Sequence, residues 1–313
     1  MKARVLPILQ RYQGLAGMAL LLAVAALWVP TFYSGDNLRN VLNQLAIPGV
    51  LAIGMTFVIL TGGIDLSVGA HLALLNCVIA TWGKAGTGLA PTALMACALG
   101  TGIGALIGLI IGWTKLPPFV VTLAAMVSLR GAAFVYTKNA NVSGIGDFLA
   151  PLEGRWLGLP MPGWVLIVVA VIAGLVLSKT ILGRRIYAVG GGGRAAHYSG
   201  VPVARTQVAA YAINGLCVAV AAILLTARTA NGQPGAATSY ELDAIAAVVV
   251  GGASLLGGYG NVAGSVLGAL FILCTDTLLN LRGIDDKVGL GLKGVILLLA
   301  VYVQNLGRLR DGA

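Results

Sequence analysis

Seven polar side chains interrupt long apolar runs of this 313-residue sequence, and they are the first candidates for chemistry. They are Asn43, Gln44, Asn76, Arg130, Asn214, Asp276 and Lys293. Polar groups are costly in an apolar medium such as a membrane, where they usually serve a transport pathway or a packing bond. We interpret the first six as candidates for a translocation pathway. We expect Arg130 to pair with Asp276, and Lys293 to extend to the outer membrane interface.

Catalytic and metal-binding patterns are absent from the sequence. His71 and His197 are too few and too far apart for a metal site, and the four cysteines lie singly in apolar runs without a CxxC pair. There is no Ser/His/Asp or Cys/His constellation and no GxxxxGK[ST] phosphate-binding loop. We therefore expect this chain to be neither an enzyme nor an ATPase, and to hold no metal or cofactor.

The composition is that of a polytopic membrane protein. Hydrophobic residues make up 58% and charged residues 10% of the chain, whereas soluble domains carry about 25% charged residues. The basic residues are scattered, so the net charge of +10 does not indicate nucleic-acid binding. Apolar stretches predict ten transmembrane helices, at about 14–31, 41–62, 65–82, 91–113, 117–136, 163–182, 207–227, 242–257, 262–281 and 288–306.

Charge placement predicts that both termini are cytoplasmic. With ten crossings in this orientation, eleven Lys and Arg residues fall inside and seven outside, as the positive-inside rule requires. The prediction is a single transmembrane domain over 1–313, with cytoplasmic ends at 1–13 and 307–313. The eighth stretch is short and rich in glycine, so it either spans or forms a broken, partly inserted helix.

The run from Gly62 to Gly69 (Gly-Gly-Ile-Asp-Leu-Ser-Val-Gly) is the sharpest local motif, and its candidate residues are Gly62, Gly63, Asp65 and Ser67. Paired glycines permit a tight turn, and Asp65 or Ser67 can cap the next helix. A role in gating or in partner contact is the alternative. The topology places this turn on the cytoplasmic side. A similar helix-break-helix pattern, or a chance likeness, recurs at 251–255.

Two further features concern packing and partners. Gly100, Gly104, Gly108 and Gly112 fall on one face of a predicted helix, which favours close approach of another helix within the same subunit over dimerisation. The loop 183–206 is the longest and most basic predicted cytoplasmic loop, with a short helix expected near 194–199. Its composition fits a solvated loop and a partner-binding loop equally.

Several motifs resemble the permeases of monosaccharide ABC importers, the ribose, xylose and galactofuranose type, and are most like the ribose permeases. They are Leu51–Gly69, Leu182–Gly191 with Ser199–Val201, and Tyr240–Gly258. The similarity extends over about 40–305, and the motifs occur in the family's order. Members often carry Asn after the glycine pair Gly190-Gly191, whereas this chain has Gly192, which puts the local shape of that loop in doubt.

The resemblance implies a multi-pass inner-membrane permease of the type II ABC-importer class that imports a simple sugar. It implies a cytoplasmic ATPase subunit that binds ATP and magnesium, a periplasmic sugar-binding protein, surrounding membrane lipid, and a second permease copy or paralogue. Loop 183–206 would then dock on the ATPase through Gly183, Arg184, Arg185, Tyr187, Arg194, Ser199 and Gly200. A branched-chain amino acid permease is the alternative. An ion-coupled secondary transporter is disfavoured, because acids are not clustered within the spans.

Overall fold

The computed structural model describes residues 18–19, 21–23, 25–284, 288–289, 291–296 and 298. The fold is all-α, with one short hairpin and two 3-10 turns among the described residues. The elements are η1 (Pro30–Tyr33), α2 (Gly35–Leu60), α3 (Val68–Lys84), α4 (Leu89–Thr114), α5 (Pro118–Tyr136), η2 (Ala150–Leu152), β1 (Arg155–Trp156), β2 (Leu159–Pro160), α6 (Met161–Lys179), α7 (Ile181–Tyr198), α8 (Val203–Thr229), α9 (Tyr240–Val250) and α10 (Val262–Leu281).

Some predictions concern residues at the two ends of the chain. Described residues between 18 and 28, and between 288 and 298, are helical. The predicted cytoplasmic ends 1–13 and 307–313 lie outside the described residues, as does the last part of the tenth predicted stretch.

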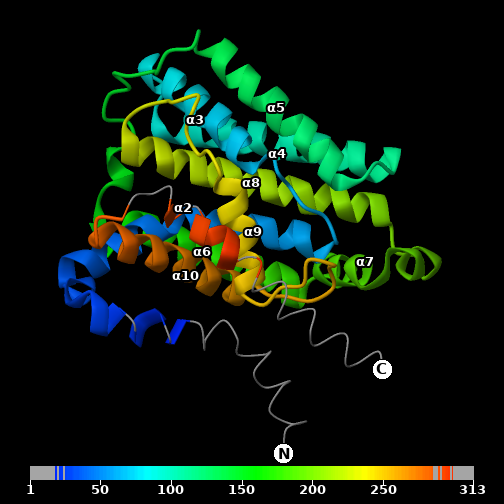
Figure 1. The fold of residues 1–313 in the computed structure, drawn as a ribbon. Helices are drawn as coiled ribbons and strands as arrows, with labels where there is room; N and C mark the ends of the chain where they lie inside the picture. Colours follow the sequence, from blue (N-terminus) through cyan, green and yellow to red (C-terminus); the bar gives the residue numbers. More distant parts are fainter. Residues whose placement is uncertain are drawn as a thin grey trace, which may run out of the picture.

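The described residues form a membrane-type bundle with six helices long and apolar enough to cross a bilayer: α2, α4, α5, α6, α8 and α10. Helix α8 lies at the centre, with α4 on one side and α2 on the other (Figure 1). Helices α2 and α8 are mostly buried, whereas α5 and α6 are mostly exposed and present apolar residues such as Val127, Val135, Val168 and Leu175. An apolar exterior around a packed centre suits lipid as the surrounding solvent.

Small residues allow α4 and α8 to touch along their backbones. A Cβ added at Gly100 would lie 2.7 Å from the carbonyl oxygen of Gly215, and one at Gly108 would lie 2.8 Å from the Cα of Val208. Gly104 and Gly112 face the same helix. The predicted close packing within one subunit is therefore confirmed, since the partner helix belongs to the same chain.

Two helix breaks meet beside Gly190. The eighth predicted stretch is a broken helix, because α9 has eleven residues and the chain is then non-helical up to Asn261. The other break follows α2. The Gly258 N–H donates to the Leu60 carbonyl oxygen at 3.0 Å, so the segment that follows α9 contacts the end of α2.

Helix α7 occupies most of the segment predicted as loop 183–206, so that part of the prediction is wrong. The Thr180 side chain caps α7 by accepting from the Gly183 N–H at 3.2 Å. The glycines indicated turns, but Gly190 is helical and packs directly on the Leu60 carbonyl and the Gly258 N–H. Gly192 interrupts the helix with φ 168° and ψ 87°, so the position that departs from the family pattern is a kink.

Candidate functional site

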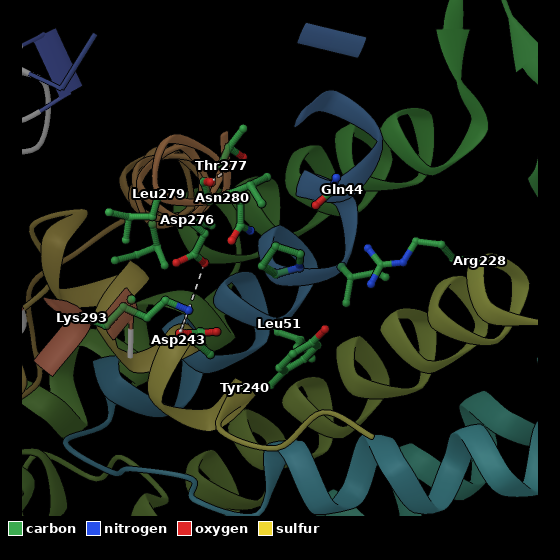
Figure 2. Close-up of a pocket in the computed structure, with 17 residues that line it drawn as sticks. Gln44, Leu51, Arg228, Tyr240, Asp243, Asp276, Thr277, Leu279, Asn280 and Lys293 are labelled. Atoms are coloured by element: carbon green, nitrogen blue, oxygen red, sulfur yellow. Dashed lines mark hydrogen bonds and ion pairs between the residues drawn. The ribbon is translucent and has the colours of Figure 1, made fainter. Parts of the chain in front are cut away.

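A polar cavity of about 280 Å³ lies near one end of the bundle (Figure 2). Gln44 comes from the first half of α2, Arg228 from the last turn of α8, and Asn280 from the last turn of α10. The first turn of α9 and the helical residues near 293 close the other walls. Its polar lining consists of Gln44, Arg228, Tyr240, Asp243, Asp276, Thr277, Asn280 and Lys293.

Local sequence explains how α2 and α9 present polar groups to the cavity. Pro48 lies inside α2 and lines the cavity. It has no N–H, so the helical bond that would end on the Gln44 carbonyl is not made. Helix α9 begins after Ser239, whose φ is 69°. Asp243 lies in the first turn of α9, where a carboxylate complements the helix dipole.

Lys293 joins two carboxylates from different helices. Its Nζ lies 2.9 Å from Oδ1 of Asp243 and 3.0 Å from Oδ2 of Asp276. The three side chains are between 18% and 29% exposed, so the pairs are partly shielded but border the cavity. Figure 2 shows Lys293 between the two acids, with the Arg228 guanidinium pointing toward the cavity from α8. The expected Arg130–Asp276 pair is wrong, because Asp276 pairs with Lys293 and Arg130 donates to two backbone carbonyls. The expected extension of Lys293 to the outer membrane interface stays a prediction.

Asn43 borders a second cavity that adjoins the first. This cavity has a volume of about 270 Å³ and shares Ile47 and Arg228 with its neighbour. Glu153, from the segment between α5 and α6, also lines it. Of the six residues predicted for a pathway, the structure therefore places Gln44 and Asp276 in one cavity and Asn43 in the adjoining one.

Asn76 and Arg130 serve a different purpose, because both hold the connector between α8 and α9. The Asn76 amide donates to the carbonyl of Asn231 at 3.0 Å and accepts from the Gln233 N–H at 2.7 Å. Arg130 donates to the carbonyls of Pro234 and Ala236 at 2.9 and 2.7 Å. These contacts tie residues 230–239 to α3 and α5, and so they fix where α9 begins.

Asn214 belongs to a closed cluster with the motif turn. Asp65 is 2% exposed and accepts from the N–H and hydroxyl of Ser67 at 2.8 and 2.6 Å and from the Asn214 amide at 2.8 Å. Gly62 makes the turn with φ 80°. Asp65 thus receives the N–H of Ser67, the residue that precedes α3, and the Ser67 side chain makes no capping hydrogen bond to the helix. Asn214 is the twelfth of 27 residues in α8, so Asp65 packs against the middle part of that helix, and the cytoplasmic placement of the turn stays a prediction.

The predicted coupling residues divide into exposed and anchoring groups. Arg184, Arg185, Arg194, Ser199 and Gly200 are exposed. Gly183 is buried, and the half-buried Tyr187 donates its hydroxyl to the Gly260 carbonyl at 2.8 Å. Burial raises the pKa of Tyr187, which keeps the phenol protonated as a donor.

Beside α7 lies a groove of about 880 Å³, which also includes the corner between α4 and α5. Its lining includes Trp113, Lys115, His197, Tyr198 and Arg205. None of these five residues was predicted as a site residue from the sequence. The same holds for Arg228, Tyr240 and Asn280 of the polar cavity. The signals available were the tyrosine that opens the motif Tyr240–Gly258 and the proline four residues after Gln44.

An apolar bundle with a polar cavity near one end and a basic helical segment has the features of a membrane permease. The sequence profile described as "Branched-chain amino acid transport system / permease component" matches residues 37–301, so the chain belongs to this permease family.

Among its relatives, the chain is 41% identical to the ribose import permease protein RbsC of Bacillus subtilis over 304 residues, covering 95% of this chain and 93% of that protein. It is 40% identical to RbsC of Escherichia coli K12, covering 95% and 94% of the two chains. It is 35% identical to the xylose transport system permease protein XylH of Escherichia coli K12, covering 90% and 87%. The resemblance to monosaccharide permeases is thus confirmed. No solved structure matches the chain.

Proposed function

We propose that this chain is the membrane-spanning permease subunit of an ATP-driven importer that translocates a simple sugar such as ribose or xylose. The observation that carries the proposal is the polar cavity near one end of an apolar bundle, in a chain about 40% identical to ribose permeases. The relatives favour a sugar over a branched-chain amino acid. The ion pairs of Asp276 and Asp243 with Lys293 give no reason to prefer an ion-coupled transporter.

The proposed arrangement is a single multi-pass domain in the bacterial inner membrane, of type II importer class, with ten crossings and both termini cytoplasmic. Under this topology the cavity lies in the periplasmic half, and α7 lies on the cytoplasmic side. A periplasmic binding protein delivers the sugar, and a second permease copy or paralogue completes the membrane core. A separate ATPase binds ATP and magnesium, so this chain holds no cofactor and is not an enzyme.

Transport tests the function directly. We expect proteoliposomes that contain this chain, its co-encoded ATPase and its binding protein to take up labelled ribose or xylose only when ATP is supplied. Liposomes without the permease are the control. Uptake of leucine in place of either pentose would contradict the sugar assignment, and uptake without ATP would contradict the class of transporter.

The coupling role of α7 needs its own experiment. The exposed Arg184 and Arg185 lie in its first turns. We expect Arg184→Glu/Arg185→Glu to reduce ATP-dependent uptake at least tenfold. The reason is that the variant loses ion pairs with acidic groups of the ATPase and places negative charges against them. Arg155→Glu, on the exposed β1 strand, is the matched control. Normal uptake by the double variant, or labelling of a cysteine at 184 from the periplasm, would contradict the proposed role.

A further inference from the structure

The polar cavity has the size of a binding site for a small solute. Its volume of about 280 Å³ is near the lower end of the ~300–1,000 Å³ typical of small-molecule pockets. Apolar residues such as Leu51, Ile272 and Leu273 form part of the wall, and polar groups converge from several helices. Ligand pockets commonly combine apolar wall residues with placed polar groups that fix the orientation of the ligand.

The charged groups that line the cavity balance one another. Among the described lining residues, Arg228 and Lys293 are cationic, and Asp243 and Asp276 are anionic. Lys293 contacts both acids, so the site offers no net charge that would favour a sugar phosphate or a metal cation. The balance favours a neutral solute.

The polar atoms match the hydrogen-bonding needs of a sugar. Each hydroxyl of a sugar both donates and accepts, so it requires acceptors and donors together. The carboxylates of Asp243 and Asp276 accept, the Arg228 guanidinium donates, and the amides of Gln44 and Asn280 do both. Lys293 engages one oxygen of each carboxylate, and a carboxylate oxygen can accept more than one hydrogen bond. Tyr240 adds an aromatic ring with an apolar face.

We propose that this cavity binds one neutral monosaccharide of pentose size within a single permease subunit. Asp243 and Asp276 accept from its hydroxyls, Arg228 and Asn280 donate to it, and Lys293 is a positioning residue that holds the two acids. The inference rests on the proposed function and extends it. The permease itself, and not only the binding protein, then recognises the sugar.

The test is direct binding to the full chain in lipid nanodiscs, without partner proteins. Saturation-transfer-difference NMR with D-ribose or D-xylose should give a saturable signal, and leucine and ribose 5-phosphate should give none. Asp276→Asn should weaken pentose binding about tenfold, the typical effect of losing a charged hydrogen-bond acceptor. Asp36→Asn, an exposed acid at the start of α2, should leave binding unchanged.

Asn280→Ala guards against a folding defect, because Asn280 is exposed at the end of α10. It should weaken binding severalfold while thermal unfolding stays as in the wild type. A wild type that gives no saturable pentose signal, or an Asn280→Ala variant that binds as tightly as the wild type, overturns the inference. If the same preparation still drives ATP-dependent pentose uptake with its partners, only the inference has failed. If uptake is also absent, the proposed function has failed.

Discussion

The cluster around Asp65 and the cavity around Asp276 use similar polar side chains in opposite ways. Asp65 is buried and receives three hydrogen bonds from Ser67 and Asn214. Asp276 is 29% exposed, shares Lys293 with Asp243, and faces a cavity. The comparison teaches that one carboxylate of this bundle is enclosed by its hydrogen-bond partners, whereas the other is held by a lysine at the border of a cavity.

The closed cluster should show the largest effect on stability. In Asp65→Ala the Ser67 N–H and hydroxyl and the Asn214 amide lose their acceptor while buried, and each such group costs about 1–3 kcal/mol. We expect a loss of roughly 3–5 kcal/mol, seen as a much lower unfolding temperature in detergent. Asp36→Ala is the control. Wild-type stability of Asp65→Ala would mean that the cluster is not closed in the way described.

The connector contacts should give an intermediate effect. Arg130→Met removes two hydrogen bonds to the carbonyls of Pro234 and Ala236, at a cost of about 2 kcal/mol. The freed connector should also exchange its amide hydrogens faster at residues 230–239, which mass spectrometry can follow. Lys84→Met, at an exposed helix end, should change neither quantity. Unchanged exchange in the arginine variant would show that other contacts hold the connector.

The open site should show the smallest effect on stability. In Asp276→Asn, Lys293 keeps Asp243 as its partner, and partly exposed pairs contribute about 0–1 kcal/mol. We expect a shift of the unfolding free energy below about 1 kcal/mol, together with a clear loss of sugar uptake. A loss of stability as large as that of Asp65→Ala would erase the distinction between the two regions.

Much of the fold could be predicted from the sequence, because its signals are local. Long apolar runs predicted the six helices that are long and apolar enough to cross a membrane, and glycines four residues apart predicted that α4 packs closely on another helix, which the structure identifies as α8. Pairings between helices were not accessible in this way. The ion pairs of Lys293 depend on where residues near 243, 276 and 293 meet in space, and no sequence spacing encodes that.

The candidate site shows the same division between local and long-range information. Gln44 and Asp276 were identified because a polar side chain in an apolar run is visible in one dimension. Arg228 and Asn280 lie at helix ends, where polar residues are ordinary, so nothing marked them. The helical state of α7 was missed because its glycines resemble turn signals, whereas Gly190 is needed for backbone contact with Leu60.

Helix α7 contacts both helix breaks at the place where they meet. Tyr187 and Gly190 of α7 bear directly on the connector that follows α9 and on the end of α2. Helix α9 ends at Val250, before that contact, and its eleven residues extend about 16 Å at the usual rise per residue back to the first turn that carries Asp243. The non-helical residues 251–261 therefore link the contact with α7 and α2 to the helix whose first turn forms one wall of the cavity.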